Sequence, residues 1–377
     1  MSTSNHKLRI AHLTDVIDGR SNSGTARVAK EIIDELGTNI QIHQTFIHFD
    51  NSQDSIYSLP NSQDVLIPFW KFGVANHFFS FLIFWVRNLF TKEIKEFDVV
   101  HWHSSRVYPF YYLIPSKKHI ISLYDATNRI VKEVNTIWTR IFFWNLRISV
   151  SRLNYIIGTS VISCKNLSRF GKFPKNKIKC IYLASNFDNL MATMPNGFSS
   201  HDDYFLCVSR WQPYKNVAKL VHAYHLANRQ DSRLPKLILE GKPVASYEEP
   251  LRLIKEYRLE HKIQVLSDLS DNELAYLYDH ALINISPSLH EGFGLPVLEG
   301  LKRQCPSLDH VYTSTSEVSG AAGFHIDMNS LLEIKGALLK ISRERGLLDE
   351  LRLNATKRAR EFTWKQTVDR LLEIYSS

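Results

Sequence analysis

Residues Ser288-Leu-His-Glu291-Gly-Phe-Gly-Leu-Pro-Val-Leu-Glu299-Gly300 contain two glutamates, eight positions apart, on either side of a turn with two glycines. Residues 281–287 form an apolar run that ends in proline, and a helical pattern resumes at residues 296–302. This order predicts a buried strand, a turn and a helix. Glycines let the backbone approach a bound group, and the free amides of a first helical turn suit a phosphate or sugar oxygens. An arbitrary glutamate pair is usually solvated, but this turn favours a ligand site that both carboxylates face.

The remaining chain alternates strand and helix in two series. The first series has a helix at 25–36 and strands at 8–13, 40–48, 98–103, 119–124, 155–159 and 178–182. The second series has strands at 205–209, 236–240, 263–266, 282–286 and, more weakly, 307–310. Short apolar strands that alternate with helices predict buried parallel sheets, which bind ligands at the carboxyl ends of their strands. The polar residues 186–203 are the predicted linker between the series.

Length and composition agree with two globular domains. The 377 residues exceed what one core usually holds, and a hydrophobic content of 44% is enough for two. Four cysteines, at 164, 180, 207 and 305, have no paired spacing, and three stand in strand-like apolar runs. They are predicted to be buried, reduced thiols rather than disulfides or zinc ligands. The first residues lead into a strand without an apolar signal segment, so we expect a cytoplasmic protein.

The net charge of +8 calls for an anionic partner. The basic residues are dispersed and show no recognition motif, so we expect no nucleic-acid partner. Two segments rich in aromatic and basic residues, 78–92 and 138–152, fit an anionic membrane surface better. In the second, Arg140 and Arg147 share a helical face with Ile141, Phe142 and Phe143 beside them. The alternative is that both segments are core-facing helices of the first domain.

The segment 288–300 resembles the Glu-x7-Glu motif of retaining glycosyltransferases, specifically family four of the GT-B fold. Residues 207–216, Cys-Val-Ser-Arg-Trp-Gln-Pro-Tyr-Lys-Asn, look like that family's strand followed by an Arg and, five residues on, a Lys-Asn that opens a helix. Residues 237–242 and 271–281 resemble the next strand and turn and the helix before the motif. The resemblance covers nearly the whole chain and is strongest from 204 to 317.

This resemblance implies the α/β GT-B fold, two Rossmann-like doubly wound domains that face a central cleft. Residues 1–190 would form the N-terminal domain on the acceptor side. Residues 204–360 would form the C-terminal domain, which binds the nucleotide-sugar donor. Residues 361–377 resemble the closing helix that crosses back to the first domain.

The resemblance also implies a donor site. Arg210 and Lys215 would bind the donor diphosphate, Arg through a bidentate fork and Lys as a point charge. Glu291 would face the donor sugar, and Glu299 would hold the ribose hydroxyls. The turn between the glutamates would complete the site with Gly292, Phe293, Gly294 and Leu295.

Two further candidates lie in the first half of the chain. Gly24 resembles the family's N-terminal glycine-rich loop, although a simple turn is an equal interpretation. Asp125 matches the Asp of the family's His-Asp pair and is the fourth catalytic candidate beside Glu291, Arg210 and Lys215. Tyr124 replaces the His of that pair, a departure that questions a histidine-assisted step.

Two histidines alternate on one predicted strand. His101 and His103 face the same side of that strand. Metal ligation is one interpretation of this spacing, and a hydrogen-bonded polar pair at the strand end is the favoured one.

The predicted activity is retaining transfer of a sugar from a UDP- or GDP-sugar to a saccharide or lipid-linked acceptor, in surface polysaccharide synthesis. No Asp-x-Asp triplet occurs in the chain, so we expect neither a metal nor another cofactor. The alternatives are a GT-B sugar phosphorylase or epimerase, and a catalytically idle GT-B module that binds a partner. Release of nucleoside diphosphate with acceptor glycosylation would distinguish the transferase from a phosphorylase or an epimerase. Nucleotide binding without turnover would indicate the idle module.

Overall fold

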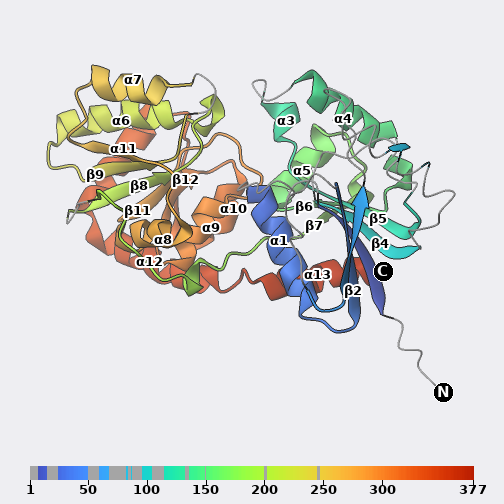
Figure 1. Cartoon of the computed structure of the whole chain (residues 1–377). Helices are drawn as coiled ribbons and strands as arrows, with labels where there is room; N and C mark the ends of the chain where they lie inside the picture. The colour runs from blue at the N-terminus through green and yellow to red at the C-terminus, as the bar shows by residue number, and fades with distance from the viewer. Residues whose placement is uncertain are drawn as a thin grey trace. The chain divides into compact units, whose positions relative to one another are not determined.

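The computed structural model describes residues 7–14, 24–49, 59–67, 82–83, 86, 96–103, 114–131, 136–148, 150–198, 202–243 and 247–377. The chain divides into two compact units, each described below by itself (Figure 1). Unit 1 holds residues 1–159, 163–183 and 364–377. Unit 2 holds residues 160–162 and 184–363.

Unit 1 is built on a parallel sheet with the strand order β3-β2-β1-β4-β5-β6-β7. Its strands are β1 (Leu8–Leu13), β2 (Ile42–Phe49), β3 (Ser62–Ile67), β4 (Phe97–Trp102), β5 (Ser116–Tyr124), β6 (Tyr155–Gly158) and β7 (Ile178–Cys180). Its helices include α1 (Gly24–Gly37), α3 (Thr127–Ile130), α4 (Ile137–Ile148), α5 (Val161–Arg169) and α13 (Trp364–Ser376). The order reverses between β1 and β4, which is the switch point of a doubly wound sheet.

Unit 2 has a second parallel sheet in the order β10-β9-β8-β11-β12-β13. The strands are β8 (Tyr204–Val208), β9 (Lys236–Glu240), β10 (Ile263–Leu266), β11 (Ile283–Ser286), β12 (Ser307–His310) and β13 (Gly323–Ile326). The helices are α6 (Val217–Gln230), α7 (Glu249–Glu256), α8 (Asp271–His280), α9 (Leu295–Lys302), α10 (Ser314–Ser319), α11 (Leu331–Arg343) and α12 (Arg345–Ala359).

Alternation along β8 and β9 explains why helices cover both faces of this sheet. Phe205 and Cys207 belong to one hydrophobic cluster, with residues of α6, α7 and α11. Tyr204 and Leu206, on the opposite face, belong to another cluster with residues of α8. Figure 1 shows α6 and α11 on one side of the sheet and α8 and α9 on the other. Side chains of a strand point alternately to its two faces, so apolar residues at every position give a sheet that is buried on both.

The strand and helix predictions were largely confirmed, with some corrections. The strand predicted at 40–48 begins at Ile42, and β3 and β13 were not predicted. The linker predicted at 186–203 is partly packed, because Phe187 and Phe198 are buried against Tyr204 and Tyr278. Most of the segment 78–92 lies outside the described residues.

The prediction for the cysteines needs a correction as well. All four are free thiols, but only Cys207 and Cys305 are buried. Cys164 lies in a helix, α5, and Cys180 ends the edge strand β7 and is exposed.

Candidate functional site

The predicted strand-to-helix junction is present in unit 2. Strand β11 ends at Ser286 and helix α9 begins at Leu295, with Pro296 in its first turn. Gly294 precedes the helix with a φ of 99°, and a Cβ there would lie 2.7 Å from the Thr315 methyl carbon. Both the left-handed backbone and the close contact require glycine. The first turn of α9 is therefore held at the carboxyl end of β11, where the Val297 amide donates to the Gly294 carbonyl at 3.0 Å.

Lys215 and Glu291 meet at this junction. Lys215 ends a short turn after β8, and β8 is the neighbour of β11 in the sheet. Its Nζ donates to Glu291 Oε1 at 2.6 Å, and both side chains are less than one fifth exposed. The structure thus brings together two predicted site residues that are 76 positions apart. This half-buried ion pair orients the ammonium and carboxylate groups near the start of α9.

Glu299 has different surroundings. It lies in α9 with 4% of its surface exposed. The Tyr278 hydroxyl is 3.5 Å from Glu299 Oε2 and donates to the carbonyl of Pro296 at 3.0 Å. Asn284 Nδ2 donates to the same carbonyl at 2.9 Å. Tyr278 and Asn284 were not predicted as site residues, because only their position beneath α9 links them to the motif.

Arg210 stands in the loop that follows β8 and is exposed. This loop passes close to the loop after β9. Gly241 has a φ of 131°, and a Cβ there would lie 1.9 Å from the Ser209 carbonyl oxygen. The backbone amide of the buried Trp211 donates to the Lys242 carbonyl at 3.0 Å. These contacts hold the chain on both sides of Arg210.

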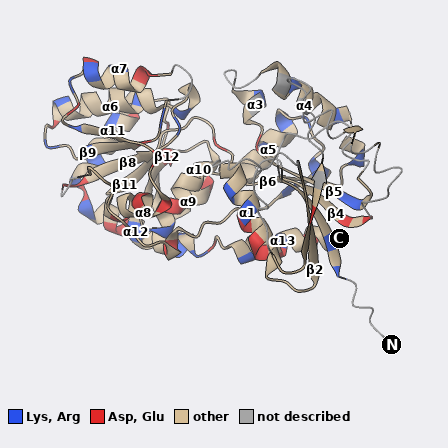
Figure 2. Cartoon of the chain, in the orientation of Figure 1, with Lys and Arg blue, Asp and Glu red and all other residues tan. Residues whose placement is uncertain are grey.

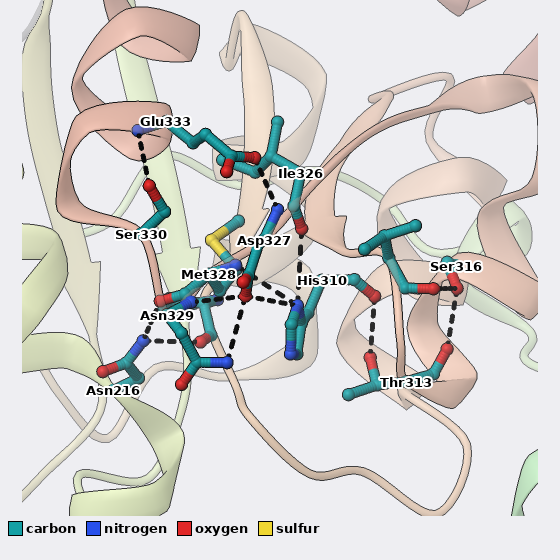
Figure 3. Close-up of polar contacts among 12 residues, drawn as sticks. Asn216, His310, Thr313, Ser316, Ile326, Asp327, Met328, Asn329, Ser330 and Glu333 are labelled. Carbon is teal, nitrogen blue, oxygen red and sulfur yellow. Dashed lines mark hydrogen bonds and ion pairs between the residues drawn. The ribbon is translucent and has the colours of Figure 1, made fainter.

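A polar network joins the neighbouring loops (Figure 3). Asn216, left-handed at a φ of 62°, donates through its amide to the carbonyls of Pro287 at 3.2 Å and Met328 at 2.8 Å. The backbone amide of Met328 donates to His310 Nδ1 at 3.2 Å. Asp327 accepts from the backbone and side-chain amides of Asn329 at 2.8 and 3.0 Å, and these bonds lower the pKa of its carboxyl. The loops after β11 and β13 are thereby tied to the start of α6.

The loop after β12 is tied to Glu291 directly. Ser314 Oγ donates to the Glu291 carbonyl oxygen at 2.8 Å. Thr313 Oγ1 donates to the His310 carbonyl at 3.1 Å (Figure 3). It also shares a hydrogen bond with the Thr315 hydroxyl. Buried hydroxyls therefore position the backbone of the motif.

Gly24 and Asp125 belong to unit 1, whereas Arg210, Lys215, residues 291–295 and Glu299 belong to unit 2. Gly24 is the exposed first residue of α1. Asp125 accepts from the Thr127 amide at 3.0 Å and from the Thr127 hydroxyl. Asp125 therefore closes a local turn just before the short helix α3, a structural function that the sequence did not predict.

Tyr124, the last residue of β5, has two unusual features. Its φ of 60° is unusual for a residue other than glycine. Its hydroxyl is buried without a hydrogen-bond partner among the described residues, and burial raises its pKa. Strained backbone and unpaired buried polar groups concentrate at functional sites. The carboxyl end of β5 thus shares two features with ligand sites.

Three buried histidines lie side by side: His12 on β1, His101 on β4 and His103 directly after β4. His12 Nδ1 and His103 Nε2 are 2.9 Å apart and share a hydrogen bond. His101 bonds to the Tyr375 hydroxyl through Nδ1 at 2.6 Å and to Ser122 Oγ through Nε2 at 2.8 Å. Burial lowers the pKa of all three rings, that of His12 to about 3.

These histidines are the group among the described residues whose nitrogens could converge on a metal. His101 is hydrogen-bonded through both ring nitrogens, as predicted. The prediction was wrong in part for His103, because its Nδ1 is buried with no hydrogen-bond partner among the described residues.

Comparison with known proteins finds relatives for the part of the chain that contains this site. Residues 194–362 match the model of the family described as Glycosyl transferases group 1. The serotype-specific mannosyltransferase WbdA of Escherichia coli is 28% identical over 186 residues, 49% of this chain and 23% of WbdA. The O-antigen chain mannosyltransferase B of Escherichia coli is 25% identical over 240 residues, 61% of this chain and 62% of that protein. This chain therefore spans less than two thirds of the length of either relative.

Solved structures agree on the fold. WaaG, a glycosyltransferase involved in lipopolysaccharide biosynthesis, matches with a TM-score of 0.72 at 13% identity, over 98% of this chain and 100% of WaaG. Anabaena Alr3699/HepE, solved with UDP and glucose, matches with a TM-score of 0.70 at 14% identity, over 98% and 99% of the two chains. At such identities the likeness concerns the fold, and it confirms the predicted GT-B class. Residues 194–362, which contain the Lys215–Glu291 pair and Glu299, are thus similar to the glycosyl transferases group 1 family.

Proposed function

We propose that this protein is a retaining glycosyltransferase that moves a sugar from a nucleoside-diphosphate sugar to a saccharide or lipid-linked acceptor in surface polysaccharide synthesis. The observation that carries the proposal is the Lys215–Glu291 pair at the start of α9, with Glu299 buried in the same helix. A cation and a carboxylate thus meet at the start of a helix and at one edge of a parallel sheet, where such sheets bind ligands.

The proposed chemistry breaks the bond between the anomeric carbon and the donor's phosphate oxygen. The electron pair leaves with the diphosphate, so negative charge grows there while positive character grows on the sugar. Arg210, Lys215 and the amides at the start of α9 would stabilise the leaving group, which needs groups held in place before the reaction. Glu291 would face the sugar carbon. The acceptor hydroxyl oxygen would bond to that carbon on the face that the leaving group vacates, and its proton would pass to the departing phosphate oxygen.

The donor is proposed by its chemistry and by relatives. HepE binds UDP and glucose, and the two related proteins named above are mannosyltransferases. We therefore propose a UDP- or GDP-hexose, with mannose as the first sugar to test. The charge of Arg210 and Lys215 would replace a metal ion at the diphosphate, so turnover should persist in excess EDTA. Loss of activity on chelation, restored by magnesium or manganese, would contradict this part of the proposal.

The decisive experiment measures nucleoside-diphosphate release from a panel of UDP- and GDP-sugars, with and without saccharide and lipid-linked acceptors. Acceptor-dependent release, with an α-linked product from an α-linked donor by NMR, would support retaining transfer. Nucleotide binding without turnover over the whole panel would favour an idle GT-B module. Sugar phosphate formed with inorganic phosphate, or an epimerised free donor, would favour a phosphorylase or an epimerase.

Binding measurements test the diphosphate contacts separately. Arg210→Ala and Lys215→Ala should each weaken UDP or GDP binding by roughly tenfold or more, because charge-assisted hydrogen bonds contribute about 1.5–3 kcal/mol each. Nucleoside binding should change little. Lys255→Ala, which removes an exposed cation on α7, is the matched control. Equal affinities for the diphosphate in wild type and both variants would remove these residues from the donor site.

A further inference from the structure

Helix α4 has apolar residues on two faces. Phe143 and Leu146 are buried in the core of unit 1. Four other large apolar residues of this helix are exposed by 64, 44, 65 and 59%, namely Ile137, Ile141, Trp144 and Ile148. Their spacings of four, three and four place them on one stripe of a helix. The sequence had left open whether this segment faces the core. The structure shows that one face does and the other is exposed.

Cations border this exposed stripe. Arg140 and Arg147 are exposed on the same helix, and Arg152 is exposed just after it. No Asp or Glu occurs from residue 136 to residue 152. Figure 2 accordingly shows blue but no red along α4. We name this surface the α4 face, defined by Ile137, Arg140, Ile141, Trp144, Arg147 and Ile148.

The combination of residue types identifies the kind of partner. Single exposed apolar residues are ordinary on a protein surface, but a continuous stripe flanked by one sign of charge marks an interaction surface. Trp is favoured at the boundary between lipid headgroups and acyl chains. Arg side chains extend their apolar stems along such a boundary and place the charge at phosphate level. An acid-free surface is complementary to anionic lipid headgroups.

We propose that the α4 face docks on an anionic membrane surface. The helix has 12 residues, and about 20 are needed to cross a bilayer, so the contact is parallel to the surface. Among the described residues, no helix combines the length and apolarity of a membrane span. The docking deepens the proposed function, since a lipid-linked acceptor would be met at this surface. It is nevertheless tested without donor or acceptor, so its failure would leave the transferase proposal unaffected.

The experiment is co-sedimentation of the full chain with phosphatidylcholine vesicles that contain or lack phosphatidylglycerol. Wild type should bind the anionic vesicles and dissociate in high salt. Arg140→Gln/Arg147→Gln should weaken this binding by about tenfold or more, because each interfacial cation contributes about 1 kcal/mol. Ile141→Ser/Trp144→Ser should weaken vesicle binding to a similar extent. The binding that remains should still depend on salt.

Matched controls separate the α4 face from general charge and hydrophobicity. Arg229→Gln/Lys255→Gln removes the same two charges from unit 2 and should bind as wild type. Leu332→Ser/Leu353→Ser removes two apolar residues that are 73 and 59% exposed, also in unit 2, and should have no effect. Circular dichroism and thermal unfolding confirm that each variant is folded.

Three results would overturn the proposal. The first is equal binding of wild type to neutral and anionic vesicles, and the second is unchanged binding by both α4 variants. The third is a dimer of wild type in light scattering that both α4 variants convert to monomers, with no vesicle binding. That result would assign the face to a second copy of the chain.

Discussion

Glu291 and Glu299 are the same residue type in different environments. Glu291 forms an ion pair with Lys215 near the start of α9. Glu299 is almost fully buried beside the Tyr278 hydroxyl. A carboxylate that is partly exposed and held by a cation suits a group that acts on the reacting sugar. A buried carboxylate with a fixed neighbour suits a static binding contact. Their substitutions should therefore affect different kinetic constants.

Glu291→Gln should lower kcat by on the order of a hundredfold, the usual scale for one preorganised electrostatic contact. Affinity for the nucleoside diphosphate should be equal or higher, because the variant frees Lys215 from its carboxylate partner. Glu299→Gln should instead raise the donor KM with little change in kcat, as expected for loss of a uniform contact. Steady-state kinetics and nucleotide titrations distinguish the two, and a normal kcat in Glu291→Gln would refute the assignment of Glu291.

Tyr278→Phe should raise the donor KM several-fold and leave kcat unchanged, because the lost hydroxyl holds Pro296 and approaches Glu299. Tyr224→Phe is the control, since its hydroxyl also donates to a backbone carbonyl, that of Pro235 at 2.7 Å. Both variants should lose about 1 kcal/mol of unfolding free energy. If the two variants shift KM alike, Tyr278 has only a stabilising role.

At the scale of elements, the junction between β11 and α9 depends on backbone geometry. Gly294 combines a φ of 99° with direct contact to Thr315, whose loop also binds the Glu291 carbonyl through Ser314. A side chain at 294 would push the loop after β12 away from the motif. The start of α9 and the loop after β12 therefore form one packed unit, which the spacing of the motif alone does not reveal.

Gly294→Ala should destabilise the protein by about 1–3 kcal/mol and weaken donor binding, since the new methyl adds strain and a clash. Thr315→Ser removes the methyl that lies 2.7 Å from the new Cβ, so it should restore part of the stability in the double variant. Gly336→Ala in α11 is the opposite control. No atom lies within 4 Å of a Cβ there, and alanine should stabilise the helix by up to about 1 kcal/mol. Denaturant unfolding measures all four proteins, and a neutral Gly294→Ala would contradict this account.

Across the whole molecule, the two units carry buried groups with opposite dependence on pH. In unit 1, burial lowers the pKa of His12, His101 and His103 below 6.5. Below pH 6.5 the unfolded chain therefore binds more protons than the folded chain. The contribution of these histidines to the free energy of unfolding is present above pH 6.5 and is lost as the pH falls. In unit 2, burial, with repulsion from Asp268, raises the pKa of Glu240 from 4.5 to about 7. The contribution of Glu240 to the free energy of unfolding is present below pH 4.5 and is lost as the pH rises towards 7.

Between pH 5 and 6.5, the stability of unit 1 should therefore rise with pH and that of unit 2 should fall, each group contributing up to about 1.4 kcal/mol per pH unit. Hydrogen exchange, compared after correction for the intrinsic rate, should show protection increasing in β1 and β4 and decreasing in β8 and β9. Glu240→Gln should remove the decrease in unit 2 and leave unit 1 unchanged. Parallel changes in the two sheets of wild type would contradict the prediction.

Much of the fold was predictable because it depends on local pattern. Apolar strands such as β8, β9 and β11 and the glycine-proline signal at α9 are short-range features, and all were found where predicted. Strands β3 and β13 were missed because their sequences, Ser-Gln-Asp-Val-Leu-Ile and Gly-Phe-His-Ile, lack the apolar run of a buried strand. Both are edge strands, so their pairing with a neighbour compensates for a weak local signal.

The residue types of the proposed donor site were likewise available from the motif, but their hydrogen-bond partners were not. The bond from Lys215 to Glu291 joins positions 76 apart, and that from Tyr278 towards Glu299 joins positions 21 apart. The turn that Asp125 closes before α3 and the two apolar faces of α4 also emerged only from the folded chain. Periodicity reports which residues favour burial, whereas hydrogen-bond partners and exposed faces depend on which strands become neighbours, a long-range outcome of packing the two cores.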